Sequence, residues 1–215
     1  MIDGGLESLI GVGLIPDADT NPAASLASAQ DALRSAGLTP PAGNEQLVAG
    51  TPNSGIFVLP GGDAPGGLED LLIDCAGIIY AELLASARAF VDSVDVDSQT
   101  YAPEDMREMK TPQGPVKAVV GAMSSVLKPG ATIQVSILRD RWVSETTITA
   151  PRVAALMHFL QSLCGLRWMD ISLKKTLKAI SLELRHLLEG QYDASSRPPT
   201  VACLFCKGTR HRVLM

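Results

Sequence analysis

The chain has 215 residues, of which 46% are hydrophobic, so it can bury a complete core, and this composition excludes a disordered or fibrous protein. Only 4% of the residues are aromatic, so the core must consist of Leu, Ile, Val and Ala, which suits helices on a parallel sheet better than a β-sandwich. Residues 1–165 carry 9 basic and 19 acidic side chains, and such an acidic body repels nucleic-acid phosphates unless divalent cations bind to it.

The sequence also indicates where the protein resides. It contains no run of about 18 apolar residues, and its first residues lack the basic and apolar regions of a signal peptide. Four cysteines are too few and too unevenly spaced for a secreted disulfide framework. We therefore expect a cytoplasmic protein without membrane contact.

The first half of the chain reads as strand, helix, strand. The apolar run 9–15 predicts a buried strand, and Asn21 and Pro22 predict the start of a helix over residues 23–35. A polar loop over residues 39–54 leads to a second buried strand at 56–59.

The later part of the chain is mainly helical. We expect a helix over residues 68–91 with a break near Gly77, and a polar loop over 92–114. Two further helices are predicted over 116–127 and 151–163. Beyond residue 166 apolar residues repeat at helical spacing among Lys and Arg, so we treat 167–215 as a separate basic tail, helical and partly irregular.

Carboxylates follow both predicted strands. Asp17 and Asp19 come after the first strand, and Glu69 and Asp70 begin the helix that follows the second. Because parallel strands end at the same edge of a sheet, these groups can converge on one cleft. Such oxygen ligands suit Mg²⁺ or Mn²⁺, and a nearby lysine, for which Lys117 is the candidate, can stabilise charge on a transferring phosphoryl group.

Each carboxylate also has a purely structural explanation. Asp19 can cap the following helix, Asp17 can be a solvated turn residue, and Glu69 can favour a helix N-terminus through the helix dipole. The pairs Gly61-Gly62 and Gly66-Gly67 lack the Lys-Ser/Thr ending of a phosphate-binding P-loop, which favours a turn-forming role. Spacing alone leaves these alternatives open.

Several motifs in a fixed order resemble a known family. They are Gly4-Gly5-Leu6-Glu7-Ser8-Leu9, Ile15-Pro16-Asp17-Ala18-Asp19-Thr20, Ile56-Phe57-Val58-Leu59-Pro60 and Pro65-Gly66-Gly67-Leu68-Glu69-Asp70-Leu71-Leu72. This order resembles an uncharacterised prokaryotic family that is similar to the Toprim domains of topoisomerases, primases and overcoming-lysogenization-defect nucleases. The resemblance continues through Lys117-Ala118 and Pro129-Gly130 and covers about three quarters of the chain.

The resemblance implies a fold, a site and an activity. The fold is a Rossmann-like α/β domain over residues 1–166, with a mostly parallel sheet flanked by helices. Asp17 and Asp19 match the Toprim metal-binding pair. The later acidic position is matched by Glu69 together with Asp70, and Lys117 matches a family lysine. The implied activity is Mg²⁺- or Mn²⁺-dependent, nuclease-like phosphodiester processing, linked to DNA maintenance or phage defence.

The chain departs from the Toprim pattern at its start. Toprim domains carry a catalytic glutamate after their first strand, and this sequence begins beyond that point, so we expect the first strand and helix to be absent. A two-metal reaction would then lack an essential group, which leaves open whether the chain is an enzyme. The sheet would also have an open edge, where a partner protein or a second copy can pair.

Three hypotheses therefore remain at this stage. The first is the nuclease-like domain, which would bind nucleic acid through the metal. The second is a non-catalytic interaction module or remnant that retains the fold and some metal affinity. The third is a receiver-like or small-phosphate-binding domain, because a strand that ends in acidic residues also suits a phospho-acceptor. Nothing in the sequence identifies DNA, RNA or a nucleotide as the substrate.

Overall fold

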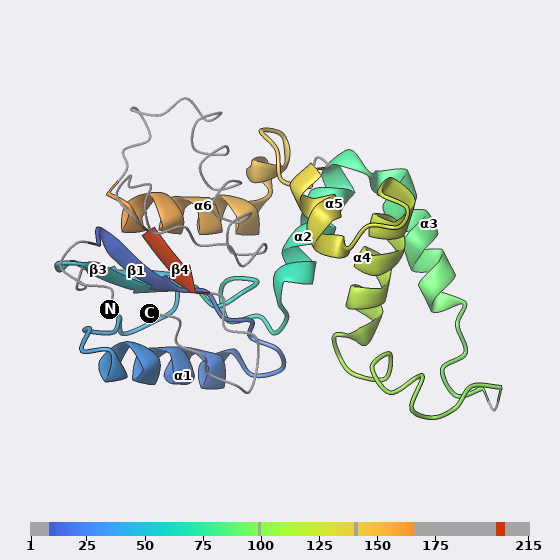
Figure 1. The fold of residues 1–215 in the computed structure, drawn as a ribbon, viewed down its shortest axis with the longest axis horizontal. Coiled ribbons are helices and arrows are strands. Elements are labelled where there is room, and N and C mark those ends of the chain that lie inside the picture. Colours follow the sequence, from blue (N-terminus) through green and yellow to red (C-terminus); the bar gives the residue numbers. More distant parts are fainter. Residues whose placement is uncertain (1–8, 99, 140–141, 166–200, 205–215) are drawn as a thin grey trace. The chain divides into compact units, whose positions relative to one another are not determined.

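The computed structural model describes residues 9–98, 100–139, 142–165 and 201–204. The chain forms two compact units (Figure 1). Unit 1 comprises Met1–Gly67 and Pro151–Met215, and unit 2 comprises Leu68–Ala150. The predicted domain over residues 1–166 is thus divided between both units. The predicted tail, apart from 201–204, lies outside the described residues.

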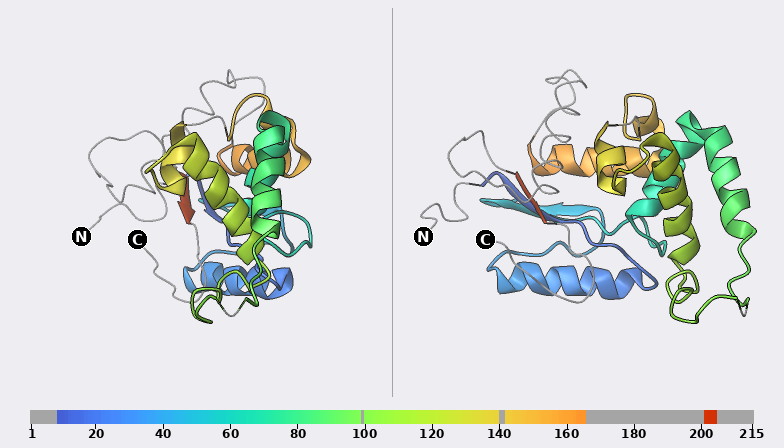
Figure 2. Two further views of the ribbon diagram at one scale, coloured as in Figure 1. Left: turned by 90° about the vertical axis from the view of Figure 1, so that its right-hand side faces the viewer. Right: turned by 45° about the vertical axis from the view of Figure 1, so that its right-hand side comes forward.

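Unit 1 is a mixed sheet with a helix on each face, which confirms the α/β class (Figures 1 and 2). Its elements are β1 (Gly11–Leu14), α1 (Pro22–Ser35), β2 (Gln46–Val48), β3 (Asn53–Ile56), α6 (Pro151–Leu163) and β4 (Val201–Leu204). The strand order is β2-β3-β1-β4. Strand β1 is parallel to β3 and to β4, whereas β2 is antiparallel to β3.

Side-chain alternation along the strands separates the two faces of this sheet. Val12 and Leu14 of β1, together with Ile56, form a buried cluster with Ala29 and Leu33 of α1. On the other face Gly13 and Gly55 lie under α6. A methyl group on Gly13 would come within 2.6 Å of a Leu163 methyl group, and one on Gly55 within 2.9 Å of the Phe159 ring. The glycines therefore allow α6 to pack directly on the backbone of the sheet.

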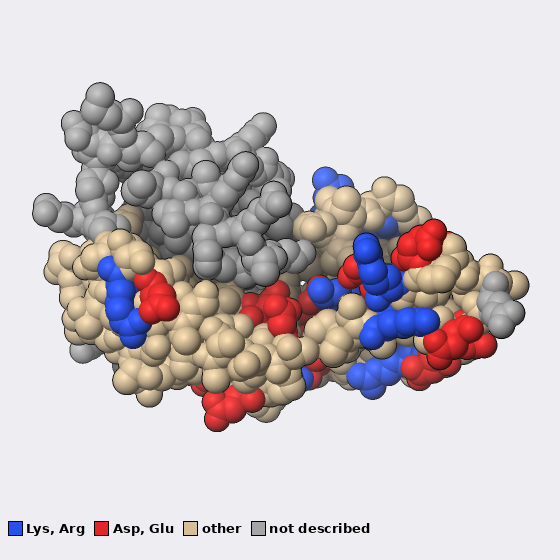
Figure 3. All heavy atoms as spheres, turned by 90° about the horizontal axis from the view of Figure 1, so that it is seen from below, with Lys and Arg blue, Asp and Glu red and all other residues tan. Residues whose placement is uncertain are grey.

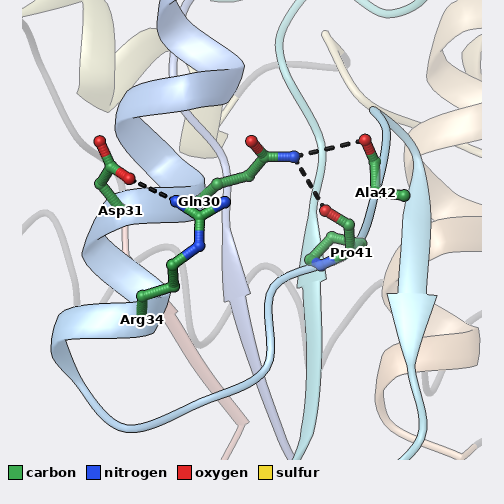
Figure 4. Close-up of polar contacts among 5 residues, drawn as sticks. All are labelled: Gln30, Asp31, Arg34, Pro41 and Ala42. Carbon is green, nitrogen blue, oxygen red and sulfur yellow. Dashed lines mark hydrogen bonds and ion pairs between the residues drawn. The ribbon is translucent and has the colours of Figure 1, made fainter.

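Helix α1 begins as the sequence predicts and anchors the loop that follows it. The Asn21 side chain accepts a hydrogen bond from the Ala24 amide at 3.0 Å and caps the helix, with Pro22 in its first turn. From the middle of α1, Gln30 donates hydrogen bonds to the carbonyl oxygens of Pro41 (2.9 Å) and Ala42 (3.3 Å) (Figure 4). This contact holds the start of the 41–45 loop against α1.

Unit 2 is built from helices around a core of its own. These are α2 (Leu68–Ile79), α3 (Ala81–Asp92), α4 (Gly114–Leu127), α5 (Ile133–Arg139) and the 3₁₀ helix η2 (Thr147–Thr149). Trp142 is fully buried among side chains of α2, α3 and α4. Its indole N–H donates a hydrogen bond to the Ser136 hydroxyl at 3.0 Å, so the buried polar atom is satisfied.

Some predicted element boundaries are wrong. The helix expected over 68–91 is two helices that meet at Tyr80, and Gly77 lies inside α2. The second strand, expected at 56–59, is assigned to Asn53–Ile56. Strand β2 and helix α5 fall where the sequence predicts no element.

In the described sheet β1 is flanked by β3 on one side and by β4 on the other, so the outer strands are β2 and β4. Across the described ranges, the structure contains no helix with the length and apolar character needed to span a membrane.

Candidate functional site

The acidic pair follows β1 in a segment that continues to pair with the chain after β3. The Phe57 amide donates to the Leu14 carbonyl at 2.9 Å, and the Leu59 amide donates to the Pro16 carbonyl at 2.8 Å. The Ala18 amide in turn donates to the Leu59 carbonyl at 2.9 Å. Asp17 is therefore held at the carboxyl end of a central parallel pair of strands, the position where α/β sheets bind ligands.

Asp19 is held by a second backbone contact, with the loop at the end of the Met1–Gly67 segment of unit 1. Asp19 and Gly66 exchange two backbone hydrogen bonds, each of 2.8 Å. Asp19 has a φ of 50°, a left-handed conformation that aspartate tolerates better than most residues. Its side chain is exposed and does not cap α1, since Asn21 does so. The helix-cap explanation of Asp19 is therefore wrong.

The Asp17 carboxyl group lies against the backbone of Gly67. A methyl group built on Gly67 would be 2.8 Å from Asp17 Oδ1 and 3.0 Å from its Cγ. Asp17 is half-buried, whereas Ala18 between the two acids is buried in the core under α1. The two carboxylates thus belong to a segment enclosed by residues 59–67 on one side and anchored in the core by Ala18.

Two residues of the 41–45 loop fix the turn after β3. The Asn44 side-chain oxygen accepts the amides of Val58 (2.6 Å) and Glu45 (2.8 Å), and its NH₂ group donates to the Gly62 carbonyl at 2.8 Å. Glu45 accepts the Gly62 amide at 2.6 Å. Gly61 and Gly62 have φ values of 114° and 61°, so their turn-forming role is confirmed.

The other predicted site residues belong to unit 2. Glu69 and Asp70 lie half-buried in the first turn of α2, where negative charge is favourable at a helix N-terminus. Lys117 is exposed and is the fourth residue of α4. Asp17 and Asp19 thus belong to unit 1, whereas Glu69, Asp70 and Lys117 lie near the starts of two helices of unit 2.

The described part of unit 1 is acidic around this segment. It carries the carboxylates Asp17, Asp19, Asp31, Glu45 and Asp63 against the cations Arg34 and Arg152, and Arg34 forms an ion pair with Asp31 on α1 (Figure 4). Figure 3 shows Lys and Arg side chains of unit 2 interspersed with Asp and Glu on the face in view. The excess of carboxylates in the described part of unit 1 favours a cation over a bare phosphate there.

Asp17 and Asp19 supply two carboxylates at the end of β1, fewer ligands than a structural zinc or a calcium site uses. Within the described ranges no three or more His, Cys, Asp or Glu side chains gather as a metal-binding group. Zinc in structural sites takes four protein ligands, and Ca²⁺ takes six to eight oxygens. Mg²⁺ keeps several water molecules and is commonly bound by one or two carboxylates, which Asp17 and Asp19 can supply.

Sequence reasoning missed three residues that shape this site: Asn44, Glu45 and Gly67. Asn44 and Glu45 lie in a polar loop, where no periodic pattern marks a buried hydrogen-bonding role. The only signal for Gly67 was the Gly66-Gly67 pair. Nothing in that pair shows that the second glycine faces a carboxylate 50 residues earlier in the chain.

The fold and the site define an α/β protein with an acidic pair at the carboxyl end of a central parallel strand. The family model "Protein of unknown function (DUF3226)" matches residues 5–165. The chain therefore belongs to the DUF3226 family. Comparisons with curated proteins and with solved structures gave no match. The family match ends within one residue of the predicted boundary at 166.

Proposed function

We propose that this chain is a Toprim-like domain that binds Mg²⁺ or Mn²⁺ and processes phosphodiesters in a nuclease-like reaction. One observation carries the proposal: Asp17 and Asp19 follow the central strand β1 and are fixed by the backbone of the 59–67 loop. The order of sequence motifs that resembles Toprim domains supports it. We further propose that the protein acts in the cytoplasm, in DNA maintenance or phage defence.

The roles of the acidic residues follow from their positions in the chain. Asp17 and Asp19 are the proposed metal ligands. Glu69 and Asp70 match the later acidic position of the Toprim pattern. On that basis we assign both residues as further acidic ligands, and Glu69 also as a catalytic group. Lys117 is the proposed stabiliser of negative charge on the phosphoryl oxygens.

A divalent cation bound to these carboxylates would polarise a phosphoryl oxygen and lower the pKa of a bound water. The chain's own contribution is to hold the carboxylates in place. The backbone pairs at Ala18 and Asp19 fix the two acids relative to the strand end. The cation would also offset the negative charge of unit 1 that opposes a phosphate substrate.

The proposal is tested by a cleavage assay on labelled DNA and RNA oligonucleotides, single-stranded and duplex. We expect cleavage in Mg²⁺ or Mn²⁺ and none in EDTA. The Asp17→Asn/Asp19→Asn variant should lose at least about a hundredfold in rate, since removal of such ligands removes transition-state stabilisation of several kcal/mol. Asp31→Asn is the matched control, because Asp31 is an exposed carboxylate on α1.

A cleavage rate that is equal in the wild type and in the double variant would contradict the assignment of the two acids. Lys117→Ala should reduce the rate while leaving metal affinity unchanged, because the lysine is assigned to the phosphoryl group and not to the metal. A Lys117→Ala variant with full activity would remove this residue from the site.

A second candidate is a non-catalytic module that keeps the acidic pair and binds a partner protein or a second copy. The observation that favours it is the small donor set, with no cluster of three or more metal ligands in the described ranges. Such a module would bind Mn²⁺ without cleaving any oligonucleotide. The outer strands of the described sheet, β2 and β4, would be the edges for such pairing. Metal binding without cleavage would therefore favour this candidate.

A further inference from the structure

Gly67 is in closer contact with the Asp17 carboxyl group than any other residue type would allow. The three heavy atoms nearest to a methyl group built on Gly67 are Oδ1, Cγ and Cβ of Asp17, at 2.8, 3.0 and 3.4 Å. Real Cβ atoms essentially never lie within 3.0 Å of another heavy atom, so a side chain at residue 67 would force the carboxyl group to move.

The need for glycine at residue 67 does not come from backbone conformation. Gly61, Gly62 and Gly66 have positive φ values of 114°, 61° and 136°, whereas Gly67 is outside this left-handed range. An alanine at residue 67 would thus avoid the backbone strain expected at its three neighbours. The close contact with the Asp17 carboxyl group is therefore the feature that disfavours a side chain at residue 67.

We propose that Gly67 is a positioning residue that sets the direction of the Asp17 carboxylate. This inference rests on the proposed metal-binding function of the acidic pair. The backbone of Gly67 limits where the carboxylate can lie, and the paired backbone of Asp19 and Gly66 holds residue 67 in place. The acidic pair is thereby kept ready for a cation.

A double-mutant cycle tests the contact without any metal. Gly67→Ala should lower the urea midpoint of unfolding in the wild-type background. In an Asp17→Ala background this loss should shrink strongly, because Oδ1 and Cγ are then absent and only the ordinary 3.4 Å contact with Cβ remains. Equal shifts in both backgrounds would overturn the inference.

Calorimetric titration of Mn²⁺ tests the consequence for binding. Gly67→Ala should weaken Mn²⁺ affinity by about tenfold or more, the size of effect seen when a group that orients a metal ligand is changed. Gly121→Ala is the matched control, because a methyl group there meets no atom within 4 Å. The ¹³C shift of the Asp17 carboxyl in the metal-free protein should change in Gly67→Ala and not in the control.

The possible results separate the two proposals. If the wild type binds Mn²⁺ and Gly67→Ala binds it equally well, the role of Gly67 is refuted and the proposed function stands. If the wild type binds no Mn²⁺, the proposed function is refuted. The double-mutant cycle and the carboxyl shift then still decide whether Gly67 positions Asp17.

Discussion

Cys75 shows how burial governs one ionisable group in unit 2. The residue is 1% exposed, and its burial raises the pKa of the thiol from the ordinary 9.0 to about 11. A hydrogen bond with Thr147 partly opposes this shift, and the neighbouring Asp74 carboxylate adds to it. The thiol is therefore protonated at neutral pH, so Cys75 is an inert core residue and not a nucleophile.

This shift gives a prediction for stability against pH. The unfolded chain releases the Cys75 proton near pH 9 and the folded chain near pH 11, so the unfolded state binds fewer protons between these values. The stabilisation is complete below about pH 9 and should fall by about 3 kcal/mol in total as pH rises past 11. Urea unfolding followed by circular dichroism at pH 7 to 11 measures it.

Cys75→Ala is the control for this titration, since other groups of the chain also titrate at high pH. The variant will be less stable at pH 7 because it leaves a small cavity. Its loss of stability between pH 9 and 11 should nevertheless be smaller than that of the wild type. If the free energy of unfolding falls equally with pH in both proteins, the loss does not come from the Cys75 thiol.

At the scale of elements, the patterned segments were predictable and the irregular ones were not. Asn21 and Pro22 located the start of α1, and the apolar periodicity placed α6 at its exact residues. Strand β2 was missed because three half-exposed or exposed residues in a polar loop show no alternation. The break at Tyr80 was assigned to Gly77, since glycine is the usual breaker, yet Gly77 fits inside α2 without a close contact.

The candidate site was predictable only in part, for the same physical reason. Asp17 and Asp19 are adjacent to a strand, so the sheet rule places them at its carboxyl end. Gly67, which lies against Asp17, and Asn44, which fixes the turn after β3, act through contacts between segments far apart in the chain. Sequence patterns among neighbouring residues do not predict such long-range contacts.

The Asn44 loop gives a prediction at the element scale. Asn44→Ala would leave the buried Val58 amide without its acceptor at 2.6 Å. It would also remove the hydrogen bond that the Asn44 side chain donates to the Gly62 carbonyl oxygen. We expect a loss of about 2 kcal/mol in the free energy of unfolding, because an unsatisfied buried donor keeps its full desolvation cost. Urea unfolding measures the loss, and amide exchange at Gly62 should become faster.

Asn21→Ala is the matched control for this loop. Asn21 makes a single capping hydrogen bond in an exposed position, so its removal should cost about 1 kcal/mol and leave exchange at Gly62 unchanged. An Asn44→Ala variant as stable as Asn21→Ala would show that the side chain does not hold the turn after β3.

At the scale of the whole molecule, the chain combines an α/β unit with a helical unit, each with its own core. The DUF3226 match spans the described parts of both units, up to residue 165. The acidic pair belongs to the α/β unit, in which Asp19 pairs with Gly66, the residue before the last one of the Met1–Gly67 segment.

The most direct test of the central claim is a titration of the full chain with Mn²⁺, followed by electron paramagnetic resonance of the free ion. The acidic pair predicts a saturable site in the wild type that Mg²⁺ displaces. The site should be lost in Asp17→Asn/Asp19→Asn and retained in Asp31→Asn. Binding that is absent from the wild type, or unchanged in the double variant, would contradict a metal site at the end of β1.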